Sequence, residues 1–222
     1  MIITIDGPVA SGKSSVAKEI GNRLGLYYLN TGLLYRAVAY ILVHEFRKKI
    51  NWDLPVEVSE HELDFVKDIE YEFISKEPHV IFRGEDITKA LSDTSYDQIA
   101  SIVSTSKAVR EKLLTVQRGI GEKYNIVADG RDCGSVVFPK ADYKFFLTAS
   151  VEARVRRVLA DPKRNVISEG YEEVKNEIES RDKRDRERAI APLEMANDAI
   201  LIDKSKLDFE QSVQAILKYI KR

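Results

Sequence analysis

The sequence lacks a second cysteine, a long apolar run and any cluster of histidines. Its single cysteine, Cys133, cannot form an intramolecular disulfide, which is typical of proteins in a reducing compartment. No hydrophobic segment approaches the roughly 18 residues that a membrane-spanning helix needs. The segment Met1–Ile5 lacks the basic start of a signal peptide, and the three histidines lack the spacing of metal ligands. We therefore expect a cytoplasmic protein with no membrane partner.

An excess of charge of one sign is also missing. The chain has 35 lysines and arginines against 36 aspartates and glutamates, for a formal charge of −1. This balance disfavours a globally basic nucleic-acid-binding protein. Hydrophobic residues make up 44% of the 222 residues, which is enough for the core of one domain and excludes a mainly disordered chain. We expect a monomer that binds no nucleic acid.

Short apolar runs alternate with helical patterns along the chain, which predicts an α/β fold. We expect a parallel five-stranded sheet flanked by helices. The expected strands are 2–5, 27–29, 124–128, 143–147 and 199–202, and the expected helices are 14–24, 33–46, 99–121 and 209–220.

The pattern changes between residues 51 and 95. Apolar and acidic residues alternate with period two over Ile69–Phe73, and a looser alternation covers Val80–Arg83, with Lys76–Pro78 between them. Such alternation is typical of an antiparallel hairpin with one solvated face. We therefore predict a small antiparallel β insert at 51–95.

A phosphate-binding loop (P-loop) is predicted near the N-terminus. The segment Gly7–Ser14 fits the pattern G-x-x-x-x-G-K-[ST] and lies between an expected strand and an expected helix. Glycines let the backbone approach phosphate oxygens, and the helix N-terminus adds partial positive charge. We expect Lys13 to reach the β- and γ-phosphates and Ser14 to bind Mg²⁺. The expected nucleotide-binding residues are Gly7, Pro8, Val9, Ala10, Ser11, Gly12, Lys13, Ser14 and Ser15.

A second phosphate site is predicted from three other segments. The first is Asn30–Arg36, where Thr31 is a suitable N-cap and Arg36 lies in the first turns of the following helix. The second is Val127–Gly134, just past an expected strand, at the edge where open α/β sheets bind ligands. The third is the charged stretch 181–188.

These segments carry side chains suited to anions and to Mg²⁺. Arg131 could bind a phosphate through two parallel hydrogen bonds, and Asp129 could be an outer ligand of Mg²⁺. Each segment also has a plainer interpretation: a capped helix with an exposed arginine, a turn with a local ion pair, and a solvated helix with i,i+4 ion pairs. In the third segment, helical spacing would place three residues on one face to hold a phosphate and a sugar hydroxyl, namely Arg181, Asp185 and Arg188.

With these segments the chain resembles the bacterial cytidylate kinases, P-loop kinases that act on CMP and dCMP. The resemblance runs nearly from end to end. Besides the phosphate loop it includes T-G-x-x-Y-R from residue 31, V-R-E-x-L-x-x-x-Q-R from 109, A-D-G-R-D-x-G-x-V-V-F-P from 128 and R-D-x-R-D-R-x-R-x-x-x-P-L from 181. The last two patterns are specific to the family, whereas the phosphate loop is not.

The resemblance implies transfer of the γ-phosphoryl group of Mg²⁺-bound ATP to CMP or dCMP. It implies that the insert at 51–95 binds the monophosphate and that a short lid covers 160–171. It implies that Arg157 lies near the adenine of ATP. The implied cytosine readers are Ser101, Arg110 and Asp132, the residues around the acceptor's phosphate and sugar are Thr31, Tyr35, Arg36, Arg131, Arg181, Asp185 and Arg188, and the catalytic cations are Lys13, Arg131, Arg181 and Arg188.

Two departures from the family pattern are mild. The family often has serine where Thr31 stands, and we expect the role of the hydroxyl to be kept. Cys133 occupies a position usually filled by an apolar residue, so we expect it to be a packing residue and not a nucleophile.

The chemistry of cytosine agrees with the implied readers. Asp132 could accept a hydrogen bond from the cytosine N4 amino group, whereas uracil would leave buried polar groups unpaired. Because a phosphate acceptor is already anionic, in-line transfer needs neither a general base nor a covalent intermediate. Catalysis then consists of positioning and charge neutralisation.

Other P-loop proteins stay open as alternatives. The nearest is a kinase for UMP, for another nucleotide or for a non-nucleotide acid such as shikimate. A nucleotide-dependent switch such as a GTPase belongs to another class, and the sequence contains no N-K-x-D, no D-x-x-G and no L-S-G-G-Q of transporter ATPases. The insert at 51–95 and the D-G-R-D motif favour CMP.

Overall fold

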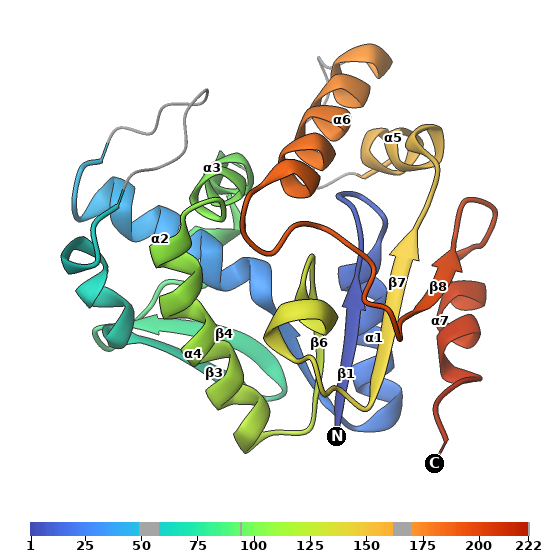
Figure 1. Ribbon diagram of the computed structural model, residues 1–222, viewed down its shortest axis with the longest axis horizontal. Coiled ribbons are helices and arrows are strands. Elements are labelled where there is room, and N and C mark those ends of the chain that lie inside the picture. Colours follow the sequence, from blue (N-terminus) through green and yellow to red (C-terminus); the bar gives the residue numbers. More distant parts are fainter. Residues whose placement is uncertain (49–57, 94, 162–169, 222) are drawn as a thin grey trace. The chain divides into compact units, whose positions relative to one another are not determined.

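Five strands form a parallel sheet in the order β2-β6-β1-β7-β8 (Figure 1), which confirms the α/β architecture predicted from the sequence. The computed structural model describes residues 1–48, 58–93, 95–161 and 170–221. The strands of this sheet are β1 (Ile2–Asp6), β2 (Tyr27–Asn30), β6 (Ile126–Gly130), β7 (Tyr143–Thr148) and β8 (Ile200–Asp203).

Contacts divide the chain into two compact units. The first unit consists of Met1–Leu26 and Ile126–Arg222, and the second unit consists of Tyr27–Asn125. The boundaries of these two units do not coincide with the boundaries of the predicted insert at 51–95 or of the predicted lid at 160–171. Parts of both segments lie outside the described residues, so the two assignments stay predictions.

The central strand of the first unit, β1, is buried on both sides. β1 lies between β6 and β7, with Ile3 paired to Val127 and to Tyr143. Ile3, Ile5 and Val127 are fully buried, which explains why β1 is a continuous β-branched run and not an alternating one.

Within the described residues, no helix has the length and apolar character needed to cross a lipid bilayer.

Among the described residues, four α-helices also belong to the first unit. Because α1 contacts β6 and α7, and α7 contacts β8, α1 and α7 cover one face of the sheet, behind the strands in Figure 1. The other two, α5 and α6, pack against each other through an apolar cluster beyond the carboxyl ends of β1 and β7. The helices are α1 (Lys13–Leu24), α5 (Val151–Leu159), α6 (Tyr171–Glu187) and α7 (Phe209–Leu217).

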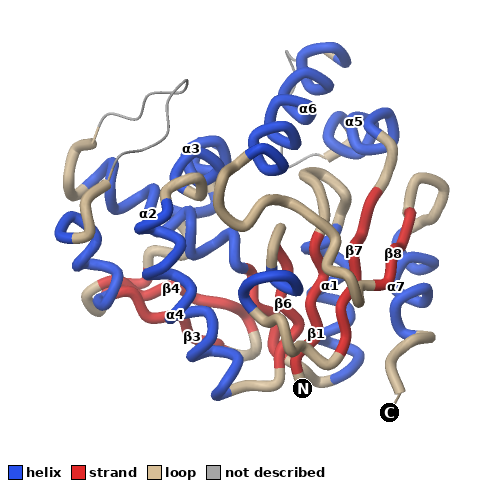
Figure 2. The backbone as a smooth tube through the Cα atoms, in the orientation of Figure 1, coloured by secondary structure: helices blue, strands red, loops and turns tan. Residues whose placement is uncertain are grey.

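The second unit combines helices with a small antiparallel sheet (Figure 2). This sheet confirms the predicted hairpin and adds a third, two-residue strand. Its strands are β3 (Ile69–Ile74), β4 (Glu77–Phe82) and β5 (Glu85–Asp86), and the helices of the unit are α2 (Thr31–His44), η1 (His61–Asp68), η2 (Ala90–Ser92), α3 (Ser95–Val103) and α4 (Lys107–Lys123).

The turn of the hairpin differs from the prediction. It lies at Ser75 and Lys76, which both have positive φ, at 52° and 69°, as the turns of tight hairpins require. Pro78 was expected between the strands but lies within β4, opposite Phe73. A proline is tolerated there because β5 pairs only with the far end of β4, at Ile81 and Phe82.

The single helix predicted over 99–121 is wrong, because the chain forms α3 and α4 with a break at residues 104–106. The Ser104 hydroxyl donates to the Ser101 carbonyl at 2.8 Å, and the Thr105 hydroxyl donates to the Ile102 carbonyl at 2.7 Å. Side-chain bonds of this kind compete with continuation of the backbone ladder. The hydroxyl run therefore ends one helix and lets the next begin.

A buried carboxylate joins β1 to the turn after β6. Asp6 accepts hydrogen bonds from the backbone N–H groups of Cys133, at 2.8 Å, and Gly134, at 2.7 Å. These residues begin a π-helical turn, η3 (Cys133–Val137). A Cβ atom on Gly134 would lie 2.8 Å from the Thr4 hydroxyl, so the close approach requires glycine. Cys133 is buried, in agreement with its predicted packing role.

The environment of Asp6 affects stability as the pH changes. Burial raises the pKa of Asp6 to about 6, although its two backbone donors oppose the shift, and the Asp132 carboxylate raises the pKa further. The usual value is 3.8. Between about pH 4 and pH 6, the folded protein therefore keeps a proton that the unfolded chain has lost. This contribution to stability is present below about pH 4 and is lost as the pH rises through about 6.

Replacement of Asp6 by asparagine should remove this pH dependence. We expect the difference in unfolding free energy between the wild type and Asp6→Asn to change by on the order of 2 to 3 kcal/mol between pH 4 and pH 7. The wild type should gain relative to the variant at the acidic end. Urea denaturation at both pH values measures this difference.

Asp142→Asn is the matched control, because it removes an exposed carboxylate that accepts the Ile2 N–H at the other end of β1. It tests whether loss of any carboxylate–backbone bond of this strand produces the effect. A difference between wild type and Asp6→Asn that is independent of pH would contradict a raised pKa at Asp6.

Candidate functional site

The segment predicted to bind phosphate forms the loop between β1 and α1. Gly7 and Gly12 both have positive φ, at 155° and 79°. A Cβ atom on Gly7 would lie 2.1 Å from the Leu147 carbonyl oxygen, so only glycine fits there. Gly12 is the N-cap of α1 and has no side chain to accept from the first-turn N–H groups. Without a side-chain acceptor, these N–H groups can donate to an anionic ligand.

Lys13 is buried at the start of α1, with 6% of its surface exposed. Its ammonium donates to the Pro8 carbonyl at 3.1 Å. Burial lowers the pKa of Lys13 to about 7, and the positive charges of Arg131 and Arg181 act in the same direction, whereas Asp129 opposes the shift. Three cations therefore lie close enough to destabilise one another, and a polyanion would relieve that repulsion.

The loop offers oxygen ligands that suit Mg²⁺. The Ser14 hydroxyl donates to the Asp129 carboxylate at 2.7 Å, so the predicted inner and outer ligands are adjacent. The Ser11 hydroxyl is buried without a hydrogen-bond partner among the described residues. This is expected of a donor whose acceptor is an oxygen of a bound ligand. The described ranges hold no cluster of three or more acidic, histidine or cysteine ligands. Mg²⁺ at Ser14 would therefore take most of its ligands from phosphate and water.

Two predicted arginines of the first unit, Arg131 and Arg188, form ion pairs with carboxylates. Arg131 donates to Asp185 at 2.7 Å, and both side chains are largely buried. Burial would raise the pKa of Asp185, but the charges of Arg131 and Arg181 outweigh it and lower the pKa, with Arg188 adding to them. Lys13 and Asp185 each interact with Arg131 and Arg181. The structure thus brings together residues from three distant segments.

Arg188 and Asp132 form a second buried pair, with 2.9 Å between Nη2 and Oδ1. The prediction that Arg188 shares a helical face with Arg181 and Asp185 is wrong, because α6 ends at Glu187 and Arg188 has extended backbone angles. Its guanidinium also donates to the Ala191 carbonyl at 2.6 Å. The extended backbone keeps Arg188 near Asp185 while it reaches Asp132.

A third buried pair holds the tip of the phosphate loop. Arg154 and Asp182 lie 2.6 Å apart, and each is about 4% exposed. Arg154 donates to the Val9 carbonyl at 3.1 Å, and Asp182 accepts from the Val9 N–H at 3.2 Å. The motif patterns did not predict this anchor, since neither residue belongs to the phosphate-loop pattern. The one signal in the sequence was the spacing of the apolar residues around Val155, which is compatible with a helix at the position of α5.

Arg157, the predicted neighbour of the adenine, lies on α5. Its Nη2 donates to the Lys204 carbonyl at 2.7 Å. Its Nη1 is buried without a hydrogen-bond partner among the described residues. This unsatisfied donor fits a ligand that carries acceptors.

In the second unit, the segment 30–36 differs from prediction at its start. Thr31 is the first residue of α2 and Asn30 occupies the N-cap position, so the predicted capping role of Thr31 is wrong. The Asn30 N–H instead donates to the Tyr71 hydroxyl at 2.9 Å. Arg36 is not a bare exposed arginine, because its Nε lies 2.7 Å from the Asp97 carboxylate.

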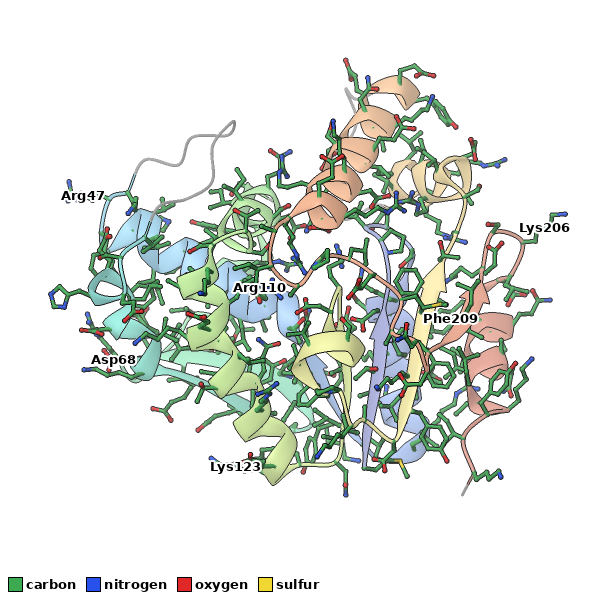
Figure 3. The ribbon with its side chains drawn as sticks, in the orientation of Figure 1. Arg47, Asp68, Arg110, Lys123, Lys206 and Phe209 are labelled. Atoms are coloured by element: carbon green, nitrogen blue, oxygen red, sulfur yellow. The ribbon has the colours of Figure 1, made fainter. Side chains whose placement is uncertain are left out.

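Three other predicted residues of this unit lie together. The Arg110 guanidinium lies over the Tyr35 ring, 5.5 Å from its centroid. Arg110 also donates to the Ser104 carbonyl at 3.2 Å, and the Ser104 hydroxyl bonds to the Ser101 carbonyl. Arg110 is labelled in Figure 3, where it belongs to α4. The break between α3 and α4 therefore brings Ser101 close to Arg110, and Ser101, Tyr35 and Arg110 are all buried.

The predicted residues therefore form two groups, each within one unit. The phosphate loop, residues 129–132 and the end of α6 make one group in the first unit. Residues 31–36, Ser101 and Arg110 make the other in the second unit. Sequence reasoning missed Asp6, Arg154, Asp182 and Lys204, which contact functional segments through tertiary packing.

Comparisons with solved structures show which folds resemble this one. Among solved structures, a shikimate kinase from Acinetobacter baumannii in complex with shikimate is similar over 98% of this chain and 91% of its own, with a TM-score of 0.50 and 14% identity. A structure from Eubacterium ventriosum covers 99% of this chain and 98% of its own, with a TM-score of 0.52 and 15% identity. At these identities the likeness shows the fold alone.

Sequence comparisons are more specific. A cytidylate kinase from Thermotoga neapolitana is 41% identical over 218 residues, which are 98% of this chain and 96% of the relative. A cytidylate kinase from Thermodesulfovibrio yellowstonii is 40% identical over 220 residues, 99% of this chain and 97% of the relative. The sequence model of the cytidylate kinase family matches residues 3–222. The chain that carries these buried arginine–carboxylate pairs beside a phosphate loop therefore belongs to the cytidylate kinase family.

Proposed function

We propose that this protein transfers the γ-phosphoryl group of Mg²⁺-bound ATP to CMP or dCMP, giving ADP and CDP or dCDP. The observation that carries the proposal is the grouping of Lys13, Arg131, Arg181 and Asp185 beside the phosphate loop. A kinase with a phosphate acceptor must bring two polyanions together, and a group of buried cations lowers the cost of doing so. Pyrimidine nucleotide metabolism, the cytoplasm and a monomeric state are part of the same proposal.

The donor side is supported by the loop geometry. The N–H groups at the start of α1 and the Lys13 ammonium bind the donor phosphates, and Arg157 lies near the adenine. Ser14, with Asp129 behind it, holds Mg²⁺, which supplies charge neutralisation at the phosphate oxygens when bound. Phosphate charge beside Lys13 would raise its pKa again, because an adjacent anion opposes the burial and the repulsion from Arg131 and Arg181 that lower it.

The acceptor side draws on three arginines, two of which are paired with carboxylates. Arg131, Arg181 and Arg188 bind the acceptor's phosphate, together with Tyr35 and Arg36, and Asp185 faces its sugar hydroxyls. Asp185 and Asp132 already hold Arg131 and Arg188 in place, so the guanidiniums are ordered before the acceptor binds. Preorganised charge of this kind needs little rearrangement during the reaction.

The base of the acceptor is read by Ser101, Arg110 and Asp132. Arg110 is fixed by the Tyr35 ring and the Ser104 carbonyl, and it donates to the N3 or O2 of cytosine. Asp132 accepts from the N4 amino group. No general base is required, since the acceptor phosphate is already charged.

Lys13→Ala should abolish most of the phosphoryl transfer. We expect kcat to fall by roughly 10³-fold or more, because the residue neutralises charge that develops on the donor phosphates. A coupled assay of ADP release with ATP and CMP measures the effect. Lys18→Ala, on the same helix, is the matched control and should keep near-normal turnover. The proposed role of Lys13 is wrong if both variants turn over at similar rates.

The acceptor panel of the same assay tests the function itself. ADP should be released when CMP or dCMP is added, and poorly with UMP, AMP or shikimate. Slow hydrolysis of the nucleotide without any acceptor would instead point to a nucleotide switch. Release with shikimate and not with CMP would assign the alternative kinase activity.

Arg181→Ala should weaken CMP binding far more than ATP binding. We expect the Kd for CMP to rise by about tenfold to a hundredfold, as is usual when a charge-assisted phosphate contact is lost. Isothermal titration with each nucleotide measures both affinities. Arg184→Ala, on α6 and one turn away, is the matched control. If the larger loss falls on ATP, Arg181 belongs to the donor side.

Asp132→Asn should relax the choice of base. Because asparagine can donate a hydrogen bond to the O4 of uracil, we expect the ratio of kcat/KM for CMP over UMP to fall by about two orders of magnitude. Asp185→Asn is the matched control, because it also breaks a buried arginine pair but should slow both acceptors alike. An unchanged ratio in Asp132→Asn would remove Asp132 from base recognition.

A further inference from the structure

A buried lysine lies against the phosphate loop from another part of the chain. Lys204 follows directly after β8, and only 5% of its surface is exposed. Its Nζ lies 2.9 Å from the position that a Cβ atom on Gly12 would take. Gly12 is the N-cap of α1, so the ammonium lies beside the N–H groups that bind phosphate.

The backbone of Lys204 is held firmly in this place. Its N–H donates to the Thr148 carbonyl at 2.8 Å, and its carbonyl accepts from Arg157 at 2.7 Å. Thr148 is the last residue of β7, and Arg157 lies on α5. The residue therefore lies at the carboxyl-terminal edge of the parallel strands, where open α/β sheets bind ligands.

No hydrogen bond or ion pair joins the Lys204 ammonium to another residue in the described part of the chain. Burial lowers the pKa of Lys204 to about 8, the positive charge of Arg157 lowers it further, and only Asp208 acts in the opposite direction. A buried cation without a counter-charge is costly. A ligand anion would remove that cost.

Two further donors of the same unit lack a partner. Arg157 Nη1 and the Ser11 hydroxyl are buried without hydrogen-bond partners among the described residues. Arg157 lies on α5 and bonds to the Lys204 carbonyl, and Ser11 lies within the phosphate loop. One acceptor-rich ligand at the loop could satisfy these donors together with the Lys204 ammonium.

We propose that the Lys204 ammonium is a further cation for the phosphates of the donor nucleotide, in addition to Lys13. The proposal rests on the proposed donor site, since Lys204 contacts the loop assigned to ATP. It predicts that Lys204 acts on ligands with a polyphosphate and leaves the acceptor nucleotide unaffected. It also predicts that the ligand-free protein gains no stability from the charge of Lys204.

Lys204→Met tests the proposal because methionine keeps the length and apolar stem of the side chain and removes only the charge. We expect the Kd for ATP and for ADP to rise by about tenfold or more, and the Kd for adenosine and for CMP to stay within about twofold of the wild type. Isothermal titration with each of the four ligands measures these values. Lys204→Arg should restore most of the affinity for ATP.

Lys206→Met is the matched control. Lys206 lies two residues further along the same loop, is exposed, and extends away from the ribbon in Figure 3. The Lys206→Met variant should have the same Kd for ATP as the wild type. The melting temperature of ligand-free Lys204→Met, measured by circular dichroism, should be equal to or above that of the wild type.

Other outcomes would overturn the proposal. An unchanged Kd for ATP in Lys204→Met would do so, and so would an equal loss for adenosine, which would assign the lysine to the sugar or base. A lower melting temperature with unchanged ATP affinity would mean that Lys204 only supports the loop. These results differ from failure of the proposed function, which would appear as wild-type protein that binds ATP but releases no ADP when CMP is added.

Discussion

Buried carboxylates fix the positive charges on which the site depends. Asp185 holds Arg131, Asp132 holds Arg188, and Asp182 holds Arg154. Without such counter-ions, several guanidiniums could not be kept so close together in a partly buried place. Each pair leaves one partner with further hydrogen-bonding capacity, since a guanidinium has five N–H donors. The arginines are thus ordered without being fully neutralised, and under the proposed function they are already in position when the phosphate binds.

The same carboxylates tie the sheet to its loops. Asp182 reaches the Val9 N–H from α6, and Asp6 reaches two N–H groups of η3 from the end of β1. Because η3 directly follows Asp132, these hydrogen bonds fix the segment that carries Arg131 and Asp132 relative to β1. Tertiary hydrogen bonds, and not local helix or strand preference, therefore determine where the functional side chains of the first unit lie.

This division explains what the sequence could and could not predict. The phosphate loop, the alternation of strands and helices, and the hairpin of the second unit follow from local patterns, and the structure confirms them. The break after Val103 depends on which carbonyl groups the Ser104 and Thr105 hydroxyls reach. The end of α6 before Arg188 and the π-helical turn at Cys133 depend on partners distant in sequence. Such contacts leave no periodic pattern to find.

The two lysines beside the phosphate loop differ from the paired arginines. Lys13 and Lys204 are both buried and both have a lowered pKa, and no ion pair joins either ammonium to a carboxylate in the described part of the chain. A protein selected only for stability would replace such residues by apolar ones, since an uncompensated buried cation is unfavourable. Their presence beside one glycine loop is explained if the counter-charge is brought by the ligand. Part of the free energy of donor binding then comes from removal of the unfavourable electrostatic energy of these two lysines in the ligand-free protein.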